Sequence, residues 1–204
     1  MTRIKICGLS RMEDMAFVND ARPDYCGFVI DFPKSRRNVT ADQARRLREK
    51  LDPAILPAGV FVNAPAEAVA ALLNDGTLSI AQFHGQEDEA YLSRLRALAP
   101  GKELWKAFVI RKPKDLEPVR SSSAHRVLLD NGYGTGAAFD WTLIRDVERP
   151  WILAGGLTPE NLPEAVSALH PWGVDLSSGV ETAGVKDYDK IRAAVQAVRA
   201  YGGA

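Results

Sequence analysis

Short runs in which apolar and polar residues alternate recur along the whole chain. In residues 3–8, Ile4 and Ile6 fall on one side of an extended chain, and Lys5 and Cys7 fall on the other. Eight runs are strand candidates: residues 3–8, 24–31, 58–63, 80–85, 103–110, 125–130, 151–157 and 173–178. The alternation predicts strands that have one apolar face and one face with polar tips.

Longer stretches with helical periodicity separate most of these runs. The clearest are residues 41–51, 65–75, 88–99, 159–170 and 187–200. Thr40 is a suitable N-cap, and Thr158 stands before Pro159, a residue type favoured at the first helical position. We therefore predict helices that begin at 41 and 159. The segment between 110 and 125 has room only for a short helix.

Strands that alternate with helices predict a parallel sheet covered by helices. Eight units either close into a (β/α)8 barrel or form an open doubly wound sheet, whose strands usually read as continuous apolar runs. Residues 173–178 instead oppose Val174 and Leu176 to Asp175 and Ser177. We predict an α/β protein with one domain, residues 1–204, that forms a small (β/α)8 TIM barrel of eight parallel strands.

Composition limits the class of partner. Among the 204 residues, Lys plus Arg and Asp plus Glu both number 26, so bulk charge indicates no nucleic-acid or membrane partner. The N-terminal segment lacks the apolar core of a signal peptide, and no apolar run approaches the roughly 18 residues of a spanning helix. We expect a soluble, cytoplasmic protein.

The two cysteines are too few for the disulfide framework of a small secreted protein. Cys26 lies near the start of the second predicted strand and Cys7 at the end of the first. In neighbouring parallel strands this offset is about four residues, or roughly 13 Å, which exceeds the reach of a disulfide. We predict reduced thiols, with Cys26 acting as a small buried hydrophobic residue.

The predicted strand ends carry chemically active residues and glycines, at the edge where barrel enzymes place their reactive groups. These are Cys7, Asp31, Asn63, His84, Asp130, Gly155–Gly156 and the run Ser177, Ser178 and Gly179. The glycine segments follow the seventh and eighth strands, the recurring phosphate site of this fold. The pattern predicts a phosphate site, and glycines that only satisfy tight turns are the alternative.

Three further features have two interpretations each. Arg36 and Arg37 either grip a carboxylate or are simply solvated, and the glycine-rich loop 131–139 is either a lid or a plain connection. His84 is either a general base or a structural residue. The three histidines do not have the spacing of metal ligands, so we expect no metal.

Seven segments, taken in order, resemble the phosphoribosylanthranilate isomerases of tryptophan biosynthesis. They are KICGLS, GFVIDFPKSRRNVT, GVFVN, QFHG, LLDNGYGTGAAFDW, ILAGGLTPENL and DLSSGVET, and the match as a whole runs from residue 3 to about residue 191. The resemblance implies a (β/α)8 barrel that rearranges N-(5-phosphoribosyl)anthranilate to 1-(2-carboxyphenylamino)-1-deoxyribulose 5-phosphate. It implies neither a cofactor nor a metal.

The resemblance also carries roles to individual residues. Cys7 matches the family's general base, Asp130 its general acid and Arg37 its anthranilate-binding arginine, while Gly155–Gly156 and Ser178–Gly179 match its phosphate loops. The expected substrate contacts are Arg36, Arg37, Gln82, His84, Gly155, Gly156, Asp175, Ser178 and Gly179. We expect a small phosphosugar–anthranilate substrate and a site that needs no second subunit.

Two departures from the family leave questions open. Arg36 and Arg37 are adjacent where the family often has one arginine, so either could hold the carboxylate. Tyr133 stands where many relatives carry glycine, which puts the closure of the loop in doubt. A general base at Cys7 must lose its proton, and we expect Lys5, two residues deeper on the same face, to favour the thiolate.

Three rival functions would share the phosphate loops. An epimerase would need a metal cluster or a carboxylate pair at the strand ends, and an indole-forming synthase would need a lysine–glutamate set. A silent phosphosugar-binding module would have no reason to keep both a strand-end thiol and a strand-end carboxylate. Cys7 together with Asp130 therefore favours the isomerase.

Overall fold

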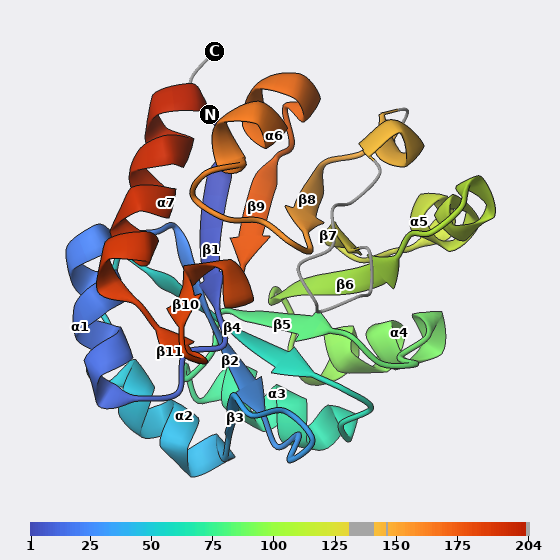
Figure 1. Cartoon of the computed structure of the whole chain (residues 1–204). Coiled ribbons are helices and arrows are strands. Elements are labelled where there is room, and N and C mark those ends of the chain that lie inside the picture. Colours follow the sequence, from blue (N-terminus) through green and yellow to red (C-terminus); the bar gives the residue numbers. More distant parts are fainter. Residues whose placement is uncertain (131–140, 146, 203–204) are drawn as a thin grey trace.

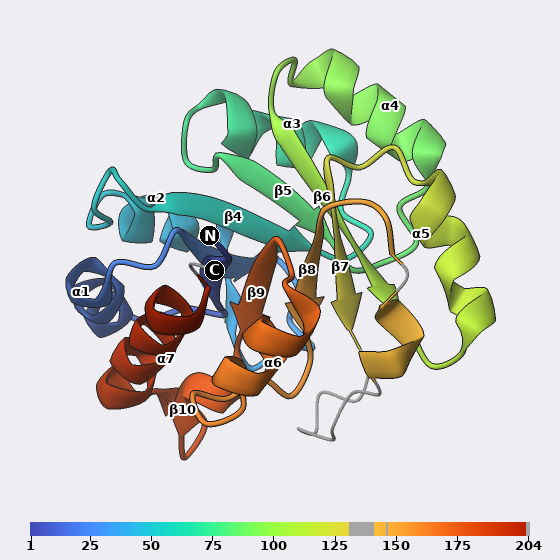
Figure 2. The same ribbon diagram turned by 90° about the horizontal axis from the view of Figure 1, so that it is seen from above.

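The strands of the chain close into a barrel, seen from two directions in Figures 1 and 2; the computed structural model describes residues 1–130, 141–145 and 147–202. The ring consists of β1 (Arg3–Cys7), β2 (Tyr25–Ile30), β4 (Leu56–Phe61), β5 (Ile80–Phe83), β6 (Glu103–Val109), β7 (Arg126–Asp130), β8 (Trp151–Ala154) and β9 (Gly173–Leu176). Their order is β1-β9-β8-β7-β6-β5-β4-β2, and parallel pairing of β1 with β2 closes the ring. The two-residue strand β3 (Asn38–Val39) pairs with β2. The predicted (β/α)8 barrel is confirmed.

Helices cover the outside of this ring (Figure 1). They are α1 (Met12–Ala21), α2 (Ala41–Arg48), α3 (Ala66–Asn74), α4 (Glu89–Leu98), α5 (Glu117–Ser121), α6 (Leu162–Leu169) and α7 (Tyr188–Tyr201). The short elements are the 3-10 helices η1 (Pro113–Leu116), η2 (Trp141–Ile144) and η3 (Ser178–Val180) and the strands β10 (Glu181–Thr182) and β11 (Val185–Lys186). The first and last helices, α1 and α7, lie side by side and bring the two ends of the barrel together.

One of the two predicted helix starts is right and the other is wrong. Thr40 caps α2 as expected: its hydroxyl accepts from the amide of Gln43 at 3.1 Å, and the Gln43 side chain accepts from the Thr40 amide at 2.8 Å. By contrast, α6 begins at Leu162, with Asn161 as its N-cap residue. The Asn161 side chain accepts from the Thr158 amide at 2.9 Å, which holds the preceding segment as a turn outside the helix.

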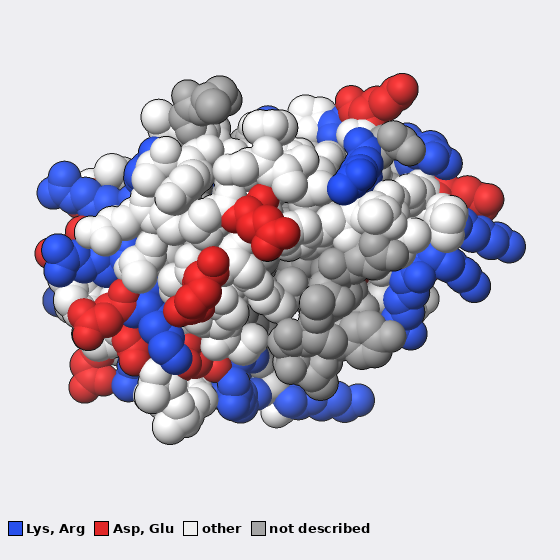
Figure 3. All heavy atoms as spheres, turned by 45° about the horizontal axis from the view of Figure 1, so that its top comes forward, with Lys and Arg blue, Asp and Glu red and all other residues white. Residues whose placement is uncertain are grey.

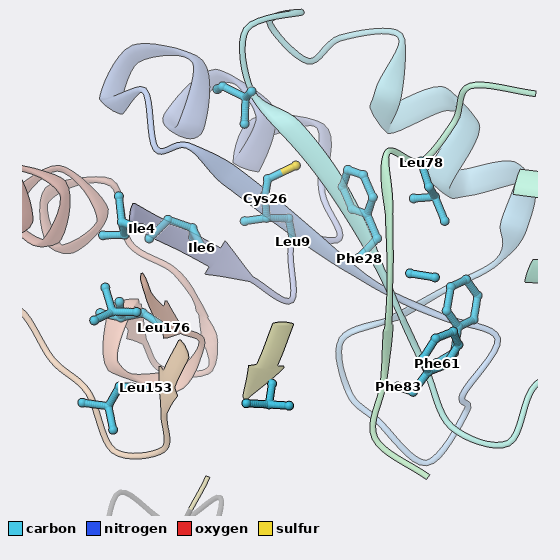
Figure 4. Packing of buried hydrophobic residues seen from close by; sticks show 14 of the residues in the cluster. Ile4, Ile6, Leu9, Cys26, Phe28, Phe61, Leu78, Phe83, Leu153 and Leu176 are labelled. Atoms are coloured by element: carbon cyan, nitrogen blue, oxygen red, sulfur yellow. The ribbon is translucent and has the colours of Figure 1, made fainter. Parts of the chain in front are cut away.

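The alternation along each strand separates two environments. Outward residues such as Ile4, Ile6 and Phe28 belong to one buried apolar layer between strands and helices (Figure 4). Inward, the lower end of the barrel is filled by aromatic rings: Trp105 meets both Tyr25 and Trp172 edge-on, with ring centroids 5.1 and 6.0 Å away. Above this floor, Lys5, Gln82 and Asp175 are buried polar residues in the layers nearer the mouth.

The two cysteines are free, but the predicted offset between them is wrong. In the observed register, Cys7 pairs with Gly27 and Ile6 with Cys26, so the cysteines stand only one position apart on adjacent strands. Neighbouring strands of a barrel are staggered, and β2 starts opposite Lys5 rather than opposite the first residue of β1. The two thiols remain separate because Cys7 faces the interior of the barrel. Cys26 is fully buried in the outer apolar layer, as expected (Figure 4).

Surface charge is mixed. Figure 3 shows acidic and basic side chains intermingled over one face, in keeping with equal totals of 26. None of the described helices combines the length and the apolar character that a membrane crossing requires.

The outer layer offers a direct test of the packing. Leu104→Ala, at a position with no exposed surface, should lower the free energy of unfolding by about 2–5 kcal/mol, because it removes buried methyl groups and leaves a cavity. Leu98→Ala makes the same change at a position that is 37% exposed and should cost less than about 1 kcal/mol. Urea denaturation measures both. Equal losses of unfolding free energy in the two variants would contradict the assignment of Leu104 to the buried outer layer.

Candidate active site

A cavity of about 330 Å³ opens at the carboxyl ends of the strands. Nine of the predicted site residues line it: Cys7, Arg37, His84, Asp130, Gly155, Gly156, Asp175, Ser178 and Gly179. Arg36 and Gln82 do not belong to the lining. Loop 131–139, expected to be either a lid or a plain connection, lies outside the described residues. Closure of the barrel therefore brings together groups that the sequence spreads over more than 170 residues.

His84 and Gln82 form a hydrogen-bonded pair on the inner face of β5 and the loop that follows it. The Nε2 atoms of the two side chains are 2.6 Å apart, and Gln82 is fully buried beneath the ring. Burial and the charge of Lys5 lower the pKa of His84. With the amide as donor, Nε2 of His84 accepts, which requires the neutral ring. His84 thus presents a neutral imidazole to the cavity.

Below the cavity, Lys5 and Asp175 form a buried ion pair that joins the first and last strands of the ring. The Lys5 ammonium donates to both carboxylate oxygens of Asp175 at 2.9 Å, and Lys5 is only 1% exposed. Burial alone would lower the pKa of Lys5, but Asp175 and Cys7 outweigh it and raise that pKa. Lys5 therefore stays a cation next to the thiol.

Two opposing effects act on the Cys7 thiol, and burial wins. Burial raises the pKa of Cys7 above its ordinary value of 9.0, the positive charges of Lys5 and Lys186 lower it, and Asp175 raises it. The expectation that Lys5 favours the thiolate is right in direction, but its effect is smaller than the cost of burial. The resting thiol is consequently protonated at neutral pH.

Glycine at position 27 makes room for the Cys7 thiol and the Lys5 ammonium. A Cβ atom there would lie 2.8 Å from Sγ of Cys7 and 3.0 and 3.1 Å from Cε and Nζ of Lys5. Gly27 faces Cys7 across the β1–β2 pair, so the thiol and the ammonium lie directly over its backbone. The missing side chain on β2 allows a thiol and a cation to share one side of the barrel.

The loops after β8 and β9 line the side of the cavity between Cys7 and Asp130, since β9 and β8 lie between β1 and β7 in the ring. Gly155 and Gly156 have positive φ angles of 86° and 67°. A Cβ atom at Gly179 would lie 1.8 Å from the Leu157 carbonyl oxygen, so only glycine allows the two loops to touch. Main chain thus lines this wall, as a phosphate site requires.

Arg37 enters the cavity from the other direction, after β2. Its side chain crosses Gly8, where a Cβ atom would lie 2.3 Å from Cδ of Arg37. Arg36 is exposed over 58% of its side chain and does not reach the lining, while Arg37 is 22% exposed and does. Of the two adjacent arginines, the structure directs Arg37 to the cavity.

Glu181 and Lys186 were not among the predicted site residues. The carboxylate of Glu181 is held by Arg36, Arg37 and Lys186, and the Lys186 ammonium also donates to the Ser177 carbonyl at 2.8 Å. Glu181 had one available signal, since it stands two residues after Gly179, within the segment DLSSGVET that carries the family resemblance. Nothing in the local sequence marks Lys186, because the β10–β11 hairpin alone brings it back to the site.

The remaining wall of the cavity is apolar. Val29 and Phe32 from β2 and its loop, with Val60 and Val62 from β4 and its loop, face the cavity. The alternation placed Val29 and Val60 on inward faces, but a valine carries no chemical signal by which sequence reading could assign it to a site. A flat aromatic ring fits such a surface beside Arg37. Among the described residues, no group of three or more His, Cys, Asp or Glu side chains could hold a metal ion.

The ion pair predicts opposite effects of its two members on Cys7. In a Cys26→Ala background, alkylation of Cys7 by iodoacetamide should accelerate with pH and reach half its limit above pH 9.0, because only the thiolate reacts. Lys5→Met should move this midpoint to higher pH, and Asp175→Asn should move it to lower pH. The rate of Cys7 alkylation at each pH is measured by quenching the reaction at a series of times and quantifying the alkylated protein by mass spectrometry.

Unpairing either charge also destabilises the barrel by about 3–5 kcal/mol, so thermal unfolding must show that each variant is folded at the assay temperature. Midpoints that shift in the same direction in both variants would contradict the assigned electrostatics.

Comparison with known proteins identifies the family. The sequence model of the family described as N-(5'phosphoribosyl)anthranilate (PRA) isomerase matches residues 4–197. The N-(5'-phosphoribosyl)anthranilate isomerase of Endomicrobium trichonymphae is 43% identical over 206 residues, which cover 98% of this chain and 99% of the relative. The crystal structure of phosphoribosyl anthranilate isomerase from Thermotoga maritima is 33% identical and superimposes with a TM-score of 0.87, covering 98% of this chain and 100% of the other.

A second solved structure contains a bound ligand. It is a phosphoribosyl anthranilate isomerase in complex with reduced 1-(o-carboxyphenylamino)-1-deoxyribulose 5-phosphate, it is 33% identical, and it covers 98% of this chain and 100% of its own with a TM-score of 0.85. These matches span nearly the whole chain and agree with the barrel and its cavity. The chain belongs to the N-(5'-phosphoribosyl)anthranilate isomerase family.

Proposed function

We propose that Cys7 and Asp130 carry out the proton transfers of the N-(5'-phosphoribosyl)anthranilate isomerase reaction, in which the aminoaldose is rearranged to 1-(2-carboxyphenylamino)-1-deoxyribulose 5-phosphate. The observation that carries the proposal is the cavity, whose lining includes the thiol, the carboxyl group, both glycine loops and Arg37.

The reaction begins with opening of the sugar ring. Asp130, at the end of β7, donates a proton to the ring oxygen while the bond between that oxygen and C1 breaks, and the anthranilate nitrogen forms a C1 imine. Cys7 faces the same cavity from the end of β1. An acid and a base on separate strands can reach two different atoms of one ligand.

The second step is removal of the proton on C2. The Cys7 thiolate takes it, and the electron pair moves toward the imine nitrogen to form an enolamine that tautomerises to the product ketone. Lys5 and Lys186 stabilise the thiolate, and the positive imine makes the C2 proton more acidic. Because the resting thiol is protonated, the free enzyme must lose a proton before this step.

The ends of the substrate are held by different walls. The phosphate binds along the main chain of the loops that contain Gly155–Gly156 and Ser178–Gly179. Arg37 binds the anthranilate carboxylate, while the aromatic ring packs against Val29 and Phe32. In this orientation C1 and C2 of the sugar would lie between β1 and β7, beside Cys7 and Asp130, and the strand order supports this arrangement.

The other expected contacts have more limited roles. His84 and Asp175 face the sugar with neutral and anionic groups, Gln82 orients His84, and Arg36 acts at a distance through Glu181. That the site needs no second subunit stays a prediction from the sequence. A cytoplasmic location stays a prediction from the sequence.

Replacement of the acid and the base tests the assignments directly. Cys7→Ser and Asp130→Asn should each lower kcat by about 10²–10⁴-fold, because each removes one proton-transfer group but keeps its approximate shape. The assay follows the loss of phosphoribosylanthranilate fluorescence. Both variants should still bind the reduced product analogue by calorimetry. Turnover at the wild-type rate in either variant would remove that residue's role.

Gly27 provides a test that leaves both catalytic groups in place. Gly27→Ala should lower kcat by at least about tenfold, because the new methyl group displaces the thiol, and a shift of 1 Å can cost about 10²-fold. Gly173→Ala is the matched control: it adds the same methyl group to β9 at the floor, where the nearest atom is 3.4 Å away. Equal losses of kcat in the two variants would refute the placement of the thiol over Gly27.

A further inference from the structure

Glu181 is a buried carboxylate among three cations, and no step of the reaction uses it. One oxygen accepts from Nε of Arg37 at 2.6 Å and from Nζ of Lys186 at 2.8 Å. The other accepts from Nη2 of Arg37 at 2.9 Å and from Nη2 of Arg36 at 2.6 Å. Burial raises the pKa of Glu181, but Arg37 and Lys186 together outweigh burial and lower it. Glu181 is therefore ionised and fully engaged.

The geometry of the Arg37 pair leaves one side of the guanidinium available. Glu181 takes the edge formed by Nε and Nη2, and Nη1 has no hydrogen-bond partner within residues 1–130, 141–145 and 147–202. A guanidinium has five N–H donors in one plane, so a second carboxylate can bind the edge formed by Nη1 and Nη2. Because Arg37 lines the cavity, a ligand carboxylate there can reach the guanidinium, and the edge formed by Nη1 and Nη2 is the one that Glu181 leaves open.

Glu181 also links this arginine to the phosphate loops. It directly follows η3, which contains the loop residues Ser178 and Gly179. Its partner Lys186 donates to the carbonyl of Ser177, and Lys190 donates to the Glu181 carbonyl at 2.8 Å. One carboxylate thus connects the wall proposed to bind phosphate with the side chain proposed to bind the carboxylate.

We propose that Glu181 is a positioning residue that holds the Arg37 guanidinium in the orientation that receives the substrate carboxylate. The inference rests on the proposed function, in which Arg37 binds that group. The anchor removes rotamer freedom from Arg37 before the ligand arrives, so less entropy is lost on binding. Two excess positive charges remain in the cluster of Arg36, Arg37, Lys186 and Glu181, which still favours an anionic ligand.

Charge and geometry predict opposite outcomes when this anion is removed. If only net charge mattered, Glu181→Gln would make the cluster more positive and tighten binding of a carboxylate. If positioning matters, the variant loses one charged partner of Arg37, and the ligand itself must order the Arg37 guanidinium. Binding of a carboxylate is then weaker. The direction of the change in affinity therefore distinguishes the two effects.

The test compares two ligands by calorimetry. One is reduced 1-(o-carboxyphenylamino)-1-deoxyribulose 5-phosphate, and the other is the same compound without the ring carboxyl group. Glu181→Gln should weaken binding of the first by about tenfold or more, the scale of a hydrogen bond to a charged group, and that of the second by less than about threefold. In turnover, KM should rise by a similar factor while kcat changes little.

The matched control is Asp24→Asn at the opposite end of the barrel. Asp24 is also a carboxylate held by two arginines, with Arg3 at 2.8 Å and Arg199 at 3.0 Å. The Asp24→Asn substitution should lower the melting temperature of the protein while leaving the affinities for both ligands unchanged. Glu181→Asp keeps the charge on a shorter side chain, and it carries the same ligand comparison if Glu181→Gln does not fold.

A second measurement asks whether Glu181 acts through Arg37. In an Arg37→Ala background, the further change Glu181→Gln should not alter the preference for the carboxylated ligand. In the Glu181→Gln single variant, three results would each overturn the inference. These are tighter binding of the carboxylated ligand, equal losses of affinity for both ligands, and an unchanged preference for the carboxylated ligand. An Arg37→Ala variant that keeps full affinity for the carboxylate would instead overturn the proposed role of Arg37.

Discussion

The interior of the barrel depends on the pairing of buried charges. Lys5 and Asp175 lie just above an apolar floor, and an unpaired charge at that depth would lose its hydration without compensation. Their contact at 2.9 Å also joins β1 to β9, the first and last strands of the ring. The pair therefore contributes to closure of the fold and provides a cation beside the thiol.

The same pair explains why the thiol is poised rather than permanently ionised. Burial disfavours the thiolate, while Lys5 and Lys186 favour it, and burial has the larger effect on the pKa of Cys7. A protonated resting thiol is less reactive toward oxidants and electrophiles than a thiolate. In the proposed reaction, Cys7 would act as the base once it has lost its proton, next to a substrate whose C2–H bond the imine makes more acidic.

The mouth of the barrel is organised by close backbone contacts as much as by side chains. Gly27 makes space for the thiol, Gly8 for the shaft of Arg37, and Gly179 for the contact between the loops after β8 and β9. Each of these glycines lies against a group that takes part in the proposed site. Larger residues there would move reactive groups without removing any of them, which is why the glycines matter for function as well as for the turns.

The sequence alone determined the barrel, its order of strands and helices, and most of the lining of the cavity, because period-two alternation and strand-end chemistry are local signals. Cys7, Asp130 and the glycine loops could be found in this way. The stagger between β1 and β2, the start of α6, and the choice between Arg36 and Arg37 were decided only by the tertiary structure. So were the ion pairs that Glu181 forms with Arg36, Arg37 and Lys186, and the balance of charge and burial at Cys7. These properties depend on which distant residues meet at a few ångströms after the ring has closed, and such contacts leave no periodic pattern in the chain.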